Sequence, residues 1–393
     1  MKNVLLLCAY LSSVYIMAQP NTEVFLLDIS EKNGSLDFTN PRNISNNDGY
    51  DNQPSFYDKD MVSFSSTRNG QTDIAQYHLD TQKLHWINDT PGGSEYSPLR
   101  VPKSKHISAI RLDTTGLQRL YQYNTSTGKS KELLKDLKVG YHVWYNKDIL
   151  VFTVLVNGGM DLMIAHLQKG TQKTVYTKVG RSLHKIPNSD LVSFIGYENN
   201  RSFVFSLDPN SGETKKLIYL PSKVQDICWL GDGSILMAQG NRIMKFNPQQ
   251  DANWKEIKQF DQKELYSLSR MAVSENGKLL AVVAEESPEV IVQKQLDAYN
   301  ARDIEAFLAT YSDNVKVYNY PHTLSYEGKA NMKTGYSSLF TNVTDLNCVI
   351  KNRIVIGNKV IDEEYLTMNG NNFSATAIYE VANGKIIAVT FIQ

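Results

Sequence analysis

The chain has 393 residues, which is more than one ordinary domain needs. Its 41 Lys and Arg residues balance 41 Asp and Glu residues, so it lacks the basic excess that is typical of nucleic-acid-binding proteins. We therefore predict no nucleic-acid partner. Cys228 and Cys348, the two cysteines beyond the N-terminal segment, are too distant in sequence to indicate a metal site. We predict neither a metal nor a cofactor.

The first 18 residues are typical of a secretory signal peptide. Lys2 precedes two apolar runs, Val4–Leu11 and Val14–Ala18, and the small residue Ala18 lies directly before Gln19. A membrane anchor is the alternative, but this apolar stretch is shorter than the ~20 residues that a span needs. We predict cleavage after Ala18, no membrane span in the mature chain, and a periplasmic or secreted location.

Residues 53–89 are predicted to form one sheet of four short strands. Apolar and polar residues alternate in Met61–Ser65 and Asp73–Leu79, and polar turns separate these runs, as in half-buried antiparallel strands. The pattern recurs at intervals of about 40 residues, which is typical of the four-stranded blades of a β-propeller. The third strands of successive repeats are predicted to end near Leu79, Tyr123, Leu167, Leu207 and Phe246.

The last repeat is completed from the other end of the chain. Leu268–Val273 and Lys278–Glu285 supply only two strands, whereas Glu23–Ile29 and Ser35–Asn40 match the third and fourth strands of a repeat. A sheet built from both ends closes the ring and removes its free edge. The sequence therefore predicts an all-β propeller of six blades.

Residues 21–286 resemble the TolB-like six-bladed propellers. The resemblance is closest in QPSF, at residues 53–56, and in MVSFSSTRNGQTDIAQYHLD, at residues 61–80. The group includes partner-binding proteins and the propellers of some peptidases, so the resemblance implies a propeller over residues 19–286 with a rigid face for a protein partner.

Two polar features of the propeller have alternative interpretations. Asp48 and Asp51, beside Gly49, could reach a cation near a channel mouth, but we interpret them as turn residues. Residues 141–144 are predicted to form an inner strand, with His142 facing the central channel.

After the propeller, a helical pattern begins. Ser287 suits an N-cap, Pro288 the first helical position, and Glu289 the positive end of the helix dipole. Asn-Gly turns separate the last strands and indicate hairpins. We predict a second domain over residues 287–393, folded as three helices on a curved antiparallel sheet. Its helices are predicted at 288–300, 304–311 and 329–340, and its strands at 315–320, 346–356, 359–368, 372–381 and 385–392.

Residues 288–393 resemble the SnoaL-like and ketosteroid-isomerase-like group of the nuclear transport factor 2 superfamily. The matching stretches are AYNARDIEAF (298–307), YSDNVKV (311–317), YEGK (326–329) and IYEVANGKI (378–386). The resemblance implies an α+β cone with an apolar mouth. Members include isomerases, cyclases, dehydratases, epoxide hydrolases and non-catalytic binders, so an activity is not implied.

The resemblance also implies where a pocket lies. A ketosteroid isomerase has its base, an Asp, just before the Pro that ends the first strand, and here that position is Asn319, which cannot accept a proton. The two oxyanion donors of that family fall near Gln295 and Thr376. We therefore predict pocket residues without ketosteroid isomerase activity: Asn319, Gln295, Thr376, Tyr299 and Val317.

Other residues could supply chemistry to the same pocket. Asp362 and Glu364 share a strand face with apolar residues, so either could be a carboxylate of raised pKa in the cone, or lie on a solvated face. His322 could donate to a ligand from the mouth, or be an exposed loop residue. These three are the weak catalytic candidates.

Two functions remain open from the sequence. The first is an exported binding protein, in which the propeller binds a protein partner and the cone holds a small apolar molecule. The second is an isomerase, lyase or hydrolase acting in the cone. We favour the first because the one recognisable catalytic set is replaced. The outer face of the C-terminal sheet could also form a homodimer.

Overall fold

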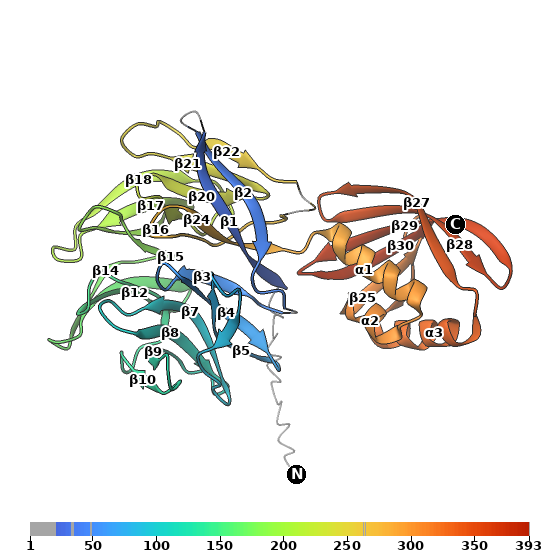
Figure 1. Ribbon diagram of the computed structural model, residues 1–393, viewed down its shortest axis with the longest axis horizontal. Helices are drawn as coiled ribbons and strands as arrows, with labels where there is room; N and C mark the ends of the chain where they lie inside the picture. Colours follow the sequence, from blue (N-terminus) through green and yellow to red (C-terminus); the bar gives the residue numbers. More distant parts are fainter. Residues whose placement is uncertain (1–20, 33–34, 48, 262, 264, 393) are drawn as a thin grey trace, which may run out of the picture.

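The computed structural model describes residues 21–32, 35–47, 49–261, 263 and 265–392. The signal peptide and its cleavage after Ala18 lie outside these residues, as does Asp48. Figure 1 shows a ring of small sheets followed by a separate body in which helices lie against one large sheet. No helix within the described part of the chain is long and apolar enough to cross a membrane.

The ring consists of six antiparallel sheets of four strands each, which confirms the predicted six-bladed propeller. The first complete blade contains β3 (Asn52–Phe56), β4 (Met61–Arg68), β5 (Gln71–His78) and β6 (Leu84–Trp86). The second blade contains β7 (Gly93–Arg100), β8 (His106–Asp113), β9 (Gln118–Asn124) and β10 (Ser130–Glu132). The third contains β11 (Val139–Trp144), β12 (Ile149–Val156), β13 (Gly159–His166) and β14 (Thr171–Tyr176). The fourth blade contains β15 (Val179–Lys185), β16 (Val192–Glu198), β17 (Arg201–Leu207) and β18 (Thr214–Leu220). The fifth contains β19 (Cys228–Trp229), β20 (Ile235–Gln239), β21 (Arg242–Phe246) and β22 (Lys255–Gln259).

The sixth blade closes the ring with strands from both ends of the propeller sequence, as predicted. Its order is β2 (Ser35–Asn43), β1 (Thr22–Lys32), β24 (Leu279–Glu285) and β23 (Met271–Val273). Val24 and Leu26 of β1 pack with Val62 and Phe64 of the first blade, and all four side chains are buried. Burial of apolar surface between blades therefore holds the closing blade in the ring.

The C-terminal body is a six-stranded sheet with three helices, of which the three helices and five of the strands were predicted. Helix α1 (Pro288–Ala301) begins directly after Ser287, whose hydroxyl accepts a hydrogen bond from the Val290 amide. Helix α2 (Ile304–Ala309) is capped by Asp303, and α3 (Lys329–Asn342) follows later in the chain. The sheet order is β26 (Thr323–Glu327), β25 (Tyr311–Asn319), β30 (Lys385–Ile392), β29 (Asn371–Ala382), β28 (Lys359–Met368) and β27 (Asn347–Ile356).

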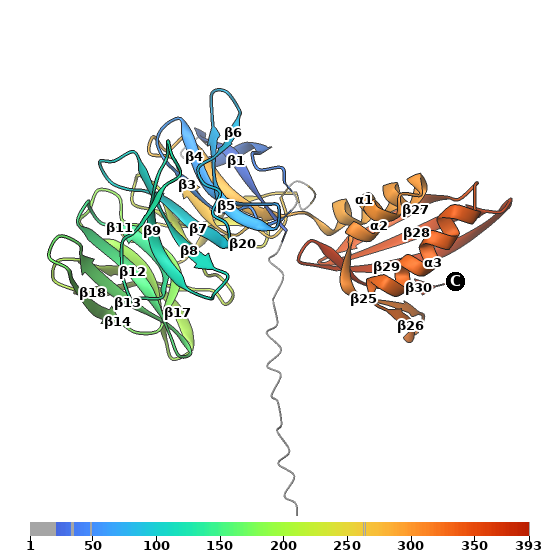
Figure 2. The same cartoon turned by 90° about the horizontal axis from the view of Figure 1, so that it is seen from below.

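The C-terminal sheet differs from the prediction in two respects. The β25–β30 pair is parallel, while the other pairs are antiparallel. Strand β26 was not predicted, because its side chains are mostly exposed and show no apolar alternation. It pairs with the end of β25 and extends the sheet beyond the first strand. Helix α1 packs across β27 to β30, and α3 packs against β25 and β26 (Figure 2).

Candidate functional site

The C-terminal domain contains a cavity of about 600 Å³ between its helices and its sheet. Two of its walls are the helices α1 and α3, and the others are β25, β26, β28, β29 and β30. Apolar side chains form most of the lining: Val317, Leu339, Leu366, Met368, Phe373, Ala375 and Phe391. The polar side chains of the lining are Tyr299, Asn319, Ser325, Tyr326, Asn331, Tyr336 and Glu364.

Glu364 is the only carboxyl group in this lining, within the described residues. It lies on β28, where alternation places Val360, Asp362 and Glu364 on the buried side of the strand, and it is 5% exposed. The Tyr379 hydroxyl donates a 2.9 Å hydrogen bond to its Oε1 atom. Burial raises the pKa of Glu364 to about 7, although the bond from Tyr379 lowers it. Near neutral pH this carboxyl group can therefore both accept and release a proton.

Three tyrosines, one buried and two half-buried, lie near the carboxyl group. Burial raises the pKa values of Tyr299, Tyr311 and Tyr336, and the negative charge of Glu364 raises them further. These hydroxyl groups consequently stay protonated and can donate hydrogen bonds. The rings also pack together, with the Tyr336 centroid 4.5 Å from that of Phe307. They stabilise the cone and supply neutral donors near the acid.

Asp362, the other carboxylate candidate, is held in a different arrangement. Both of its oxygens accept 2.7 Å hydrogen bonds from Arg353, and the side chain is 1% exposed. Arg353 also donates to the Gln293 side chain of α1. Asp362 does not line the cavity. Arg353 balances its charge outside the cavity. The prediction that Asp362 could supply a carboxylate to the pocket is therefore wrong.

The other predicted pocket residues divide into two groups. Tyr299, Val317 and Asn319 line the cavity, with Asn319 at its exposed mouth. Gln295 is buried but lies outside the lining, and its hydrogen bond lowers the pKa of Tyr311. Thr376 is also outside the lining. Alternation along β29 turns Ala375 into the cavity and Thr376 to the opposite face.

His322 does not reach the cavity either. Its exposed ring stacks on Tyr318, with ring centroids 4.9 Å apart and an interplanar angle of 3°. Neither Tyr336 nor Tyr379 is among the residues predicted for this site. The signals were present: Tyr336 lies on the apolar face of the predicted third helix, and Tyr379 alternates with Ala375 and Ala377 along its strand.

The propeller contains a second cavity, of about 410 Å³, in its central channel. Arg181 donates two hydrogen bonds of 3.0 Å from Nε to Asp226, and Arg270 lies 3.8 Å from the same carboxylate. His142 lines the channel as predicted, but it is 3% exposed and hydrogen-bonded to the Ser108 hydroxyl at 2.7 Å. Burial lowers the pKa of His142 to about 3, so it stays neutral. The two arginines leave this part of the channel with an excess of positive charge.

Comparison with known proteins supports the two parts separately. Residues 292–389 match the family model of the SnoaL-like domain. A solved structure from Agrobacterium tumefaciens, described as a TolB, has 10% identity and a TM-score of 0.53, and covers 67% of this chain and 98% of its own. No curated protein matches the chain.

Two further solved structures match the C-terminal part. An NTF2-like protein of unknown function from Cytophaga hutchinsonii has 18% identity and a TM-score of 0.24, and covers 27% of this chain and 88% of its own. An LEH-like epoxide hydrolase from M. tuberculosis has 18% identity and a TM-score of 0.25, and covers 27% of this chain and 80% of its own. At such identities a likeness concerns only the fold. The chain therefore has a propeller fold like that of the TolB structure, followed by a SnoaL-like domain at residues 292–389.

Proposed function

We propose that this protein, which joins a TolB-like propeller to a SnoaL-like domain, is exported and binds a small apolar molecule in its C-terminal cavity. The observation that supports this function is the cavity of about 600 Å³, in which an apolar lining surrounds Glu364. Ligand pockets of this volume, with an apolar wall and a few polar groups, are typical of small-molecule sites. The proposed units are residues 1–18 as signal peptide, 19–286 as propeller and 287–393 as the binding domain.

The polar groups of the cavity favour an uncharged ligand. Glu364 and its tyrosine neighbours supply no positive charge that would balance an anion. A protonated Glu364 can donate a hydrogen bond to a carbonyl or hydroxyl group, and an ionised one can accept from a hydroxyl group. We therefore expect a largely apolar molecule with one neutral polar group that faces Glu364.

A ligand screen on the full mature chain tests this proposal. Neutral lipophilic molecules should raise the melting temperature of the wild-type protein. Ala375→Phe should abolish that rise because the larger side chain would occupy the cavity. Thr376→Phe is the matched control, because Thr376 lies on the other face of the same strand, and it should keep the ligand response. An equal response in both variants would contradict binding in this cavity.

An acid–base enzyme is the second candidate, and Glu364 is the observation that favours it. A carboxyl group with a pKa of about 7 is suited to general acid or base catalysis near neutral pH. Replacing it by glutamine keeps its shape and removes its proton chemistry. If a bound molecule is converted, Glu364→Gln should lose turnover while retaining binding. Retained turnover would exclude Glu364 as the catalytic group.

The propeller and the C-terminal sheet offer two further surfaces. We propose a protein partner on the propeller face around the central channel, where Arg181 and Arg270 favour an acidic segment.

We also propose that the C-terminal domain forms a homodimer through its sheet. Exposed apolar side chains on the edge strand β27 support it: Val349 (47%), Ile354 (54%) and Ile356 (64%). Sedimentation of the mature protein, with Ile354→Lys as the interface variant, tests the dimer.

A further inference from the structure

The junction between the closing blade and the first blade buries two carboxyl groups close together. Glu23 lies on β1 and is 6% exposed, and Asp51 lies just before β3 and is fully buried. The Thr22 hydroxyl and the Asp51 amide tie the two segments together through hydrogen bonds of 2.9 and 3.0 Å. Burial raises the pKa of Asp51 to about 7, and the negative charge of Glu23 raises it further. The two carboxyl groups therefore lie close enough to interact.

No donor reaches the Asp51 carboxylate at normal hydrogen-bond geometry. Neither Oδ1 nor Oδ2 has such a partner among the described residues, and the buried Ser66 hydroxyl has none either. Ser66, Asn47 and Ser45 lie near enough only to lower the pKa of Asp51 in part. Ser45 cannot supply the missing donor. Its hydroxyl already donates to Glu23 Oε2 at 2.6 Å and accepts from the Val24 amide at 2.9 Å. A buried carboxylate without a donor is costly, and in native proteins it signals a missing partner.

The junction between the blade of β3–β6 and the blade of β7–β10 can be compared with the closing junction. There the Ile74 amide donates to Asn88 Oδ1 at 2.9 Å, just as the Val24 amide donates to Ser45. This correspondence aligns Asn88 with Ser45. It also aligns Asp73, which follows Thr72 on β5, with Glu23, which follows Thr22 on β1.

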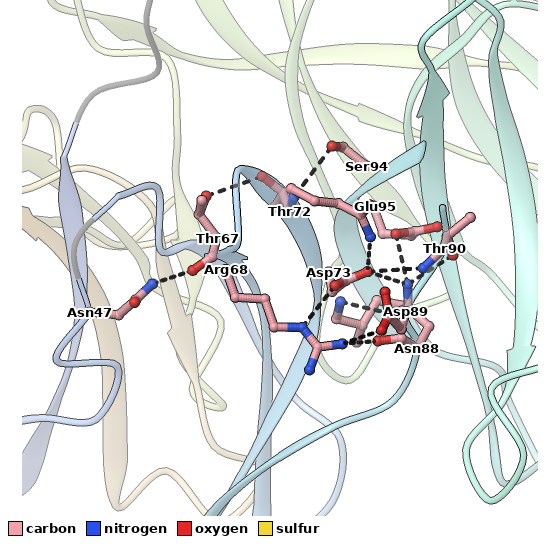
Figure 3. Close-up of polar contacts among 12 residues, drawn as sticks. Asn47, Thr67, Arg68, Thr72, Asp73, Asn88, Asp89, Thr90, Ser94 and Glu95 are labelled. Atoms are coloured by element: carbon pink, nitrogen blue, oxygen red, sulfur yellow. Dashed lines mark hydrogen bonds and ion pairs between the residues drawn. The ribbon is translucent and has the colours of Figure 1, made fainter. Parts of the chain in front are cut away.

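In this second junction the two carboxyl groups, Asp73 and Glu95, both accept hydrogen bonds from side-chain donors. Figure 3 shows Asn88 between Asp73 and Glu95, with its Nδ2 atom donating to Asp73 at 2.8 Å and to Glu95 at 2.7 Å. Arg68 adds a charged hydrogen bond of 3.0 Å to Asp73. Glu95 also accepts from the Tyr123 hydroxyl at 2.7 Å. An amide bridge and a guanidinium therefore balance this pair.

The closing junction lacks both of these groups. Ser45 is too short to bridge two carboxylates as Asn88 does. Among the described residues, no Lys or Arg forms an ion pair with Glu23 or Asp51. The residue that follows β24 is Glu286, whose charge adds to that of Glu23. Two negative charges thus meet where the equivalent junction has a bridging donor and a positive charge.

We propose that a Ca²⁺ ion binds between Glu23 and Asp51 and joins the first and last blades of the propeller. Ca²⁺ takes carboxylate, hydroxyl and water oxygens in irregular geometry, and Glu23, Asp51 and Ser66 supply such oxygens from three separate elements. The smaller Mg²⁺ demands near-ideal octahedral geometry, so this mixed set favours Ca²⁺. Glu23, Asp51 and Ser66 offer neither the imidazole nor the thiolate ligands that are typical of zinc sites. The ion replaces the bridging amide and the arginine of the neighbouring junction.

Calcium titration of the EDTA-treated mature protein tests this site. Ca²⁺ should raise the melting temperature of the propeller by roughly 5 °C when free Ca²⁺ is 100-fold above its Kd, and Mg²⁺ should do less. Isothermal titration should show one site per chain. Wild-type protein that binds no Ca²⁺ at millimolar concentration would overturn the proposal.

Variants separate this site from nonspecific effects. Asp51→Asn should abolish the Ca²⁺ response because it removes one charge and adds a donor toward Glu23. Ser45→Asn should rebuild the bridge of the neighbouring junction, so it should raise stability in EDTA and weaken the Ca²⁺ response. Glu95→Gln is the matched control in the satisfied junction and should keep the response in full. A Ca²⁺ response that survives in Asp51→Asn would place the ion elsewhere and overturn the assignment.

Discussion

The hydroxyl group of Tyr379 donates a 2.9 Å hydrogen bond to Oε1 of Glu364 inside the apolar cone. Both side chains are almost fully buried, so the pair takes a carboxyl group out of water with one direct donor. The energetic cost of ionising Glu364 is the main electrostatic feature of the cavity. It connects the stability of the domain with the charge state of the site.

Glu364→Gln should change how the stability of the C-terminal domain depends on pH. The folded-state pKa of about 7 lies above the ordinary value of 4.5, so the folded protein binds this proton more tightly than the unfolded chain. Wild-type stability is therefore favoured below pH 4.5 and is lost as the pH rises towards 7. Between pH 4 and pH 8 the stability of the variant relative to the wild type should therefore increase by on the order of 3 kcal/mol, as this shift implies. Urea unfolding from pH 4 to 8 measures the difference, and an unchanged pH profile would contradict it.

Tyr379→Phe should separate the hydrogen bond from the packing of the ring. Because the bond from Tyr379 lowers the pKa of Glu364, its loss should raise that pKa above its wild-type value. We also expect a loss of about 1 kcal/mol in the free energy of unfolding. Carboxyl NMR titration of labelled protein reports the pKa directly. Tyr365→Phe, in which the altered tyrosine has no hydrogen bond to Glu364, serves as the control.

Removing one partner of the buried Arg353–Asp362 ion pair should destabilise the C-terminal domain strongly. Arg353→Met leaves Asp362 buried without its two hydrogen bonds, and the expected destabilisation is about 3–5 kcal/mol. The double variant Arg353→Met with Asp362→Leu should recover much of that loss, because two apolar groups can replace the pair. Chemical denaturation of both variants measures this coupling. Equal stabilities of wild type and Arg353→Met would show that the pair contributes nothing.

The local parts of the fold could be predicted from the sequence, and the nonlocal contacts could not. Strands β28 and β30 occupy the predicted residues because Asn-Gly turns bound them, and the caps Ser287 and Asp303 mark their helices by type and position. Thr376 shows the limit, since a slip of one residue turns a strand position to the other face. The ion pair of Asp362 and the donors missing at Asp51 depend on strands that meet only after folding, which a single sequence does not reveal.

Ring closure gives a prediction for the N-terminal strands. Removing residues 19–42 would delete β1 and nearly all of β2 and leave β24 as an open edge, which invites pairing with another chain. We expect the shortened protein, which starts at Asn43, to aggregate and to melt at a lower temperature. Light scattering and thermal melting against the mature chain measure this. A shortened protein that stays monodisperse with unchanged melting would contradict a stabilising role for β1 and β2.

Asn319 provides the last prediction, which concerns steroid chemistry. Isomerisation of a 5-ene-3-ketosteroid needs a group that moves a proton between carbon atoms, and an amide cannot accept that proton. We therefore expect little activity from the wild type. Asn319 lines the cavity at its mouth, so Asn319→Asp places a carboxylate beside a bound molecule and should raise the rate measurably. General base catalysis contributes ~10²–10⁴-fold where the geometry is right.

The control for this experiment is Asn331→Asp, which adds a carboxylate at another polar position of the same lining. A gain in Asn319→Asp alone would locate the reactive position beside β25, whereas equal gains in both variants would indicate only a charge effect. Efficient isomerisation by the wild type would contradict the prediction. The base would then be sought at Glu364, the carboxyl group of the lining, by comparing the rates of wild type and Glu364→Gln.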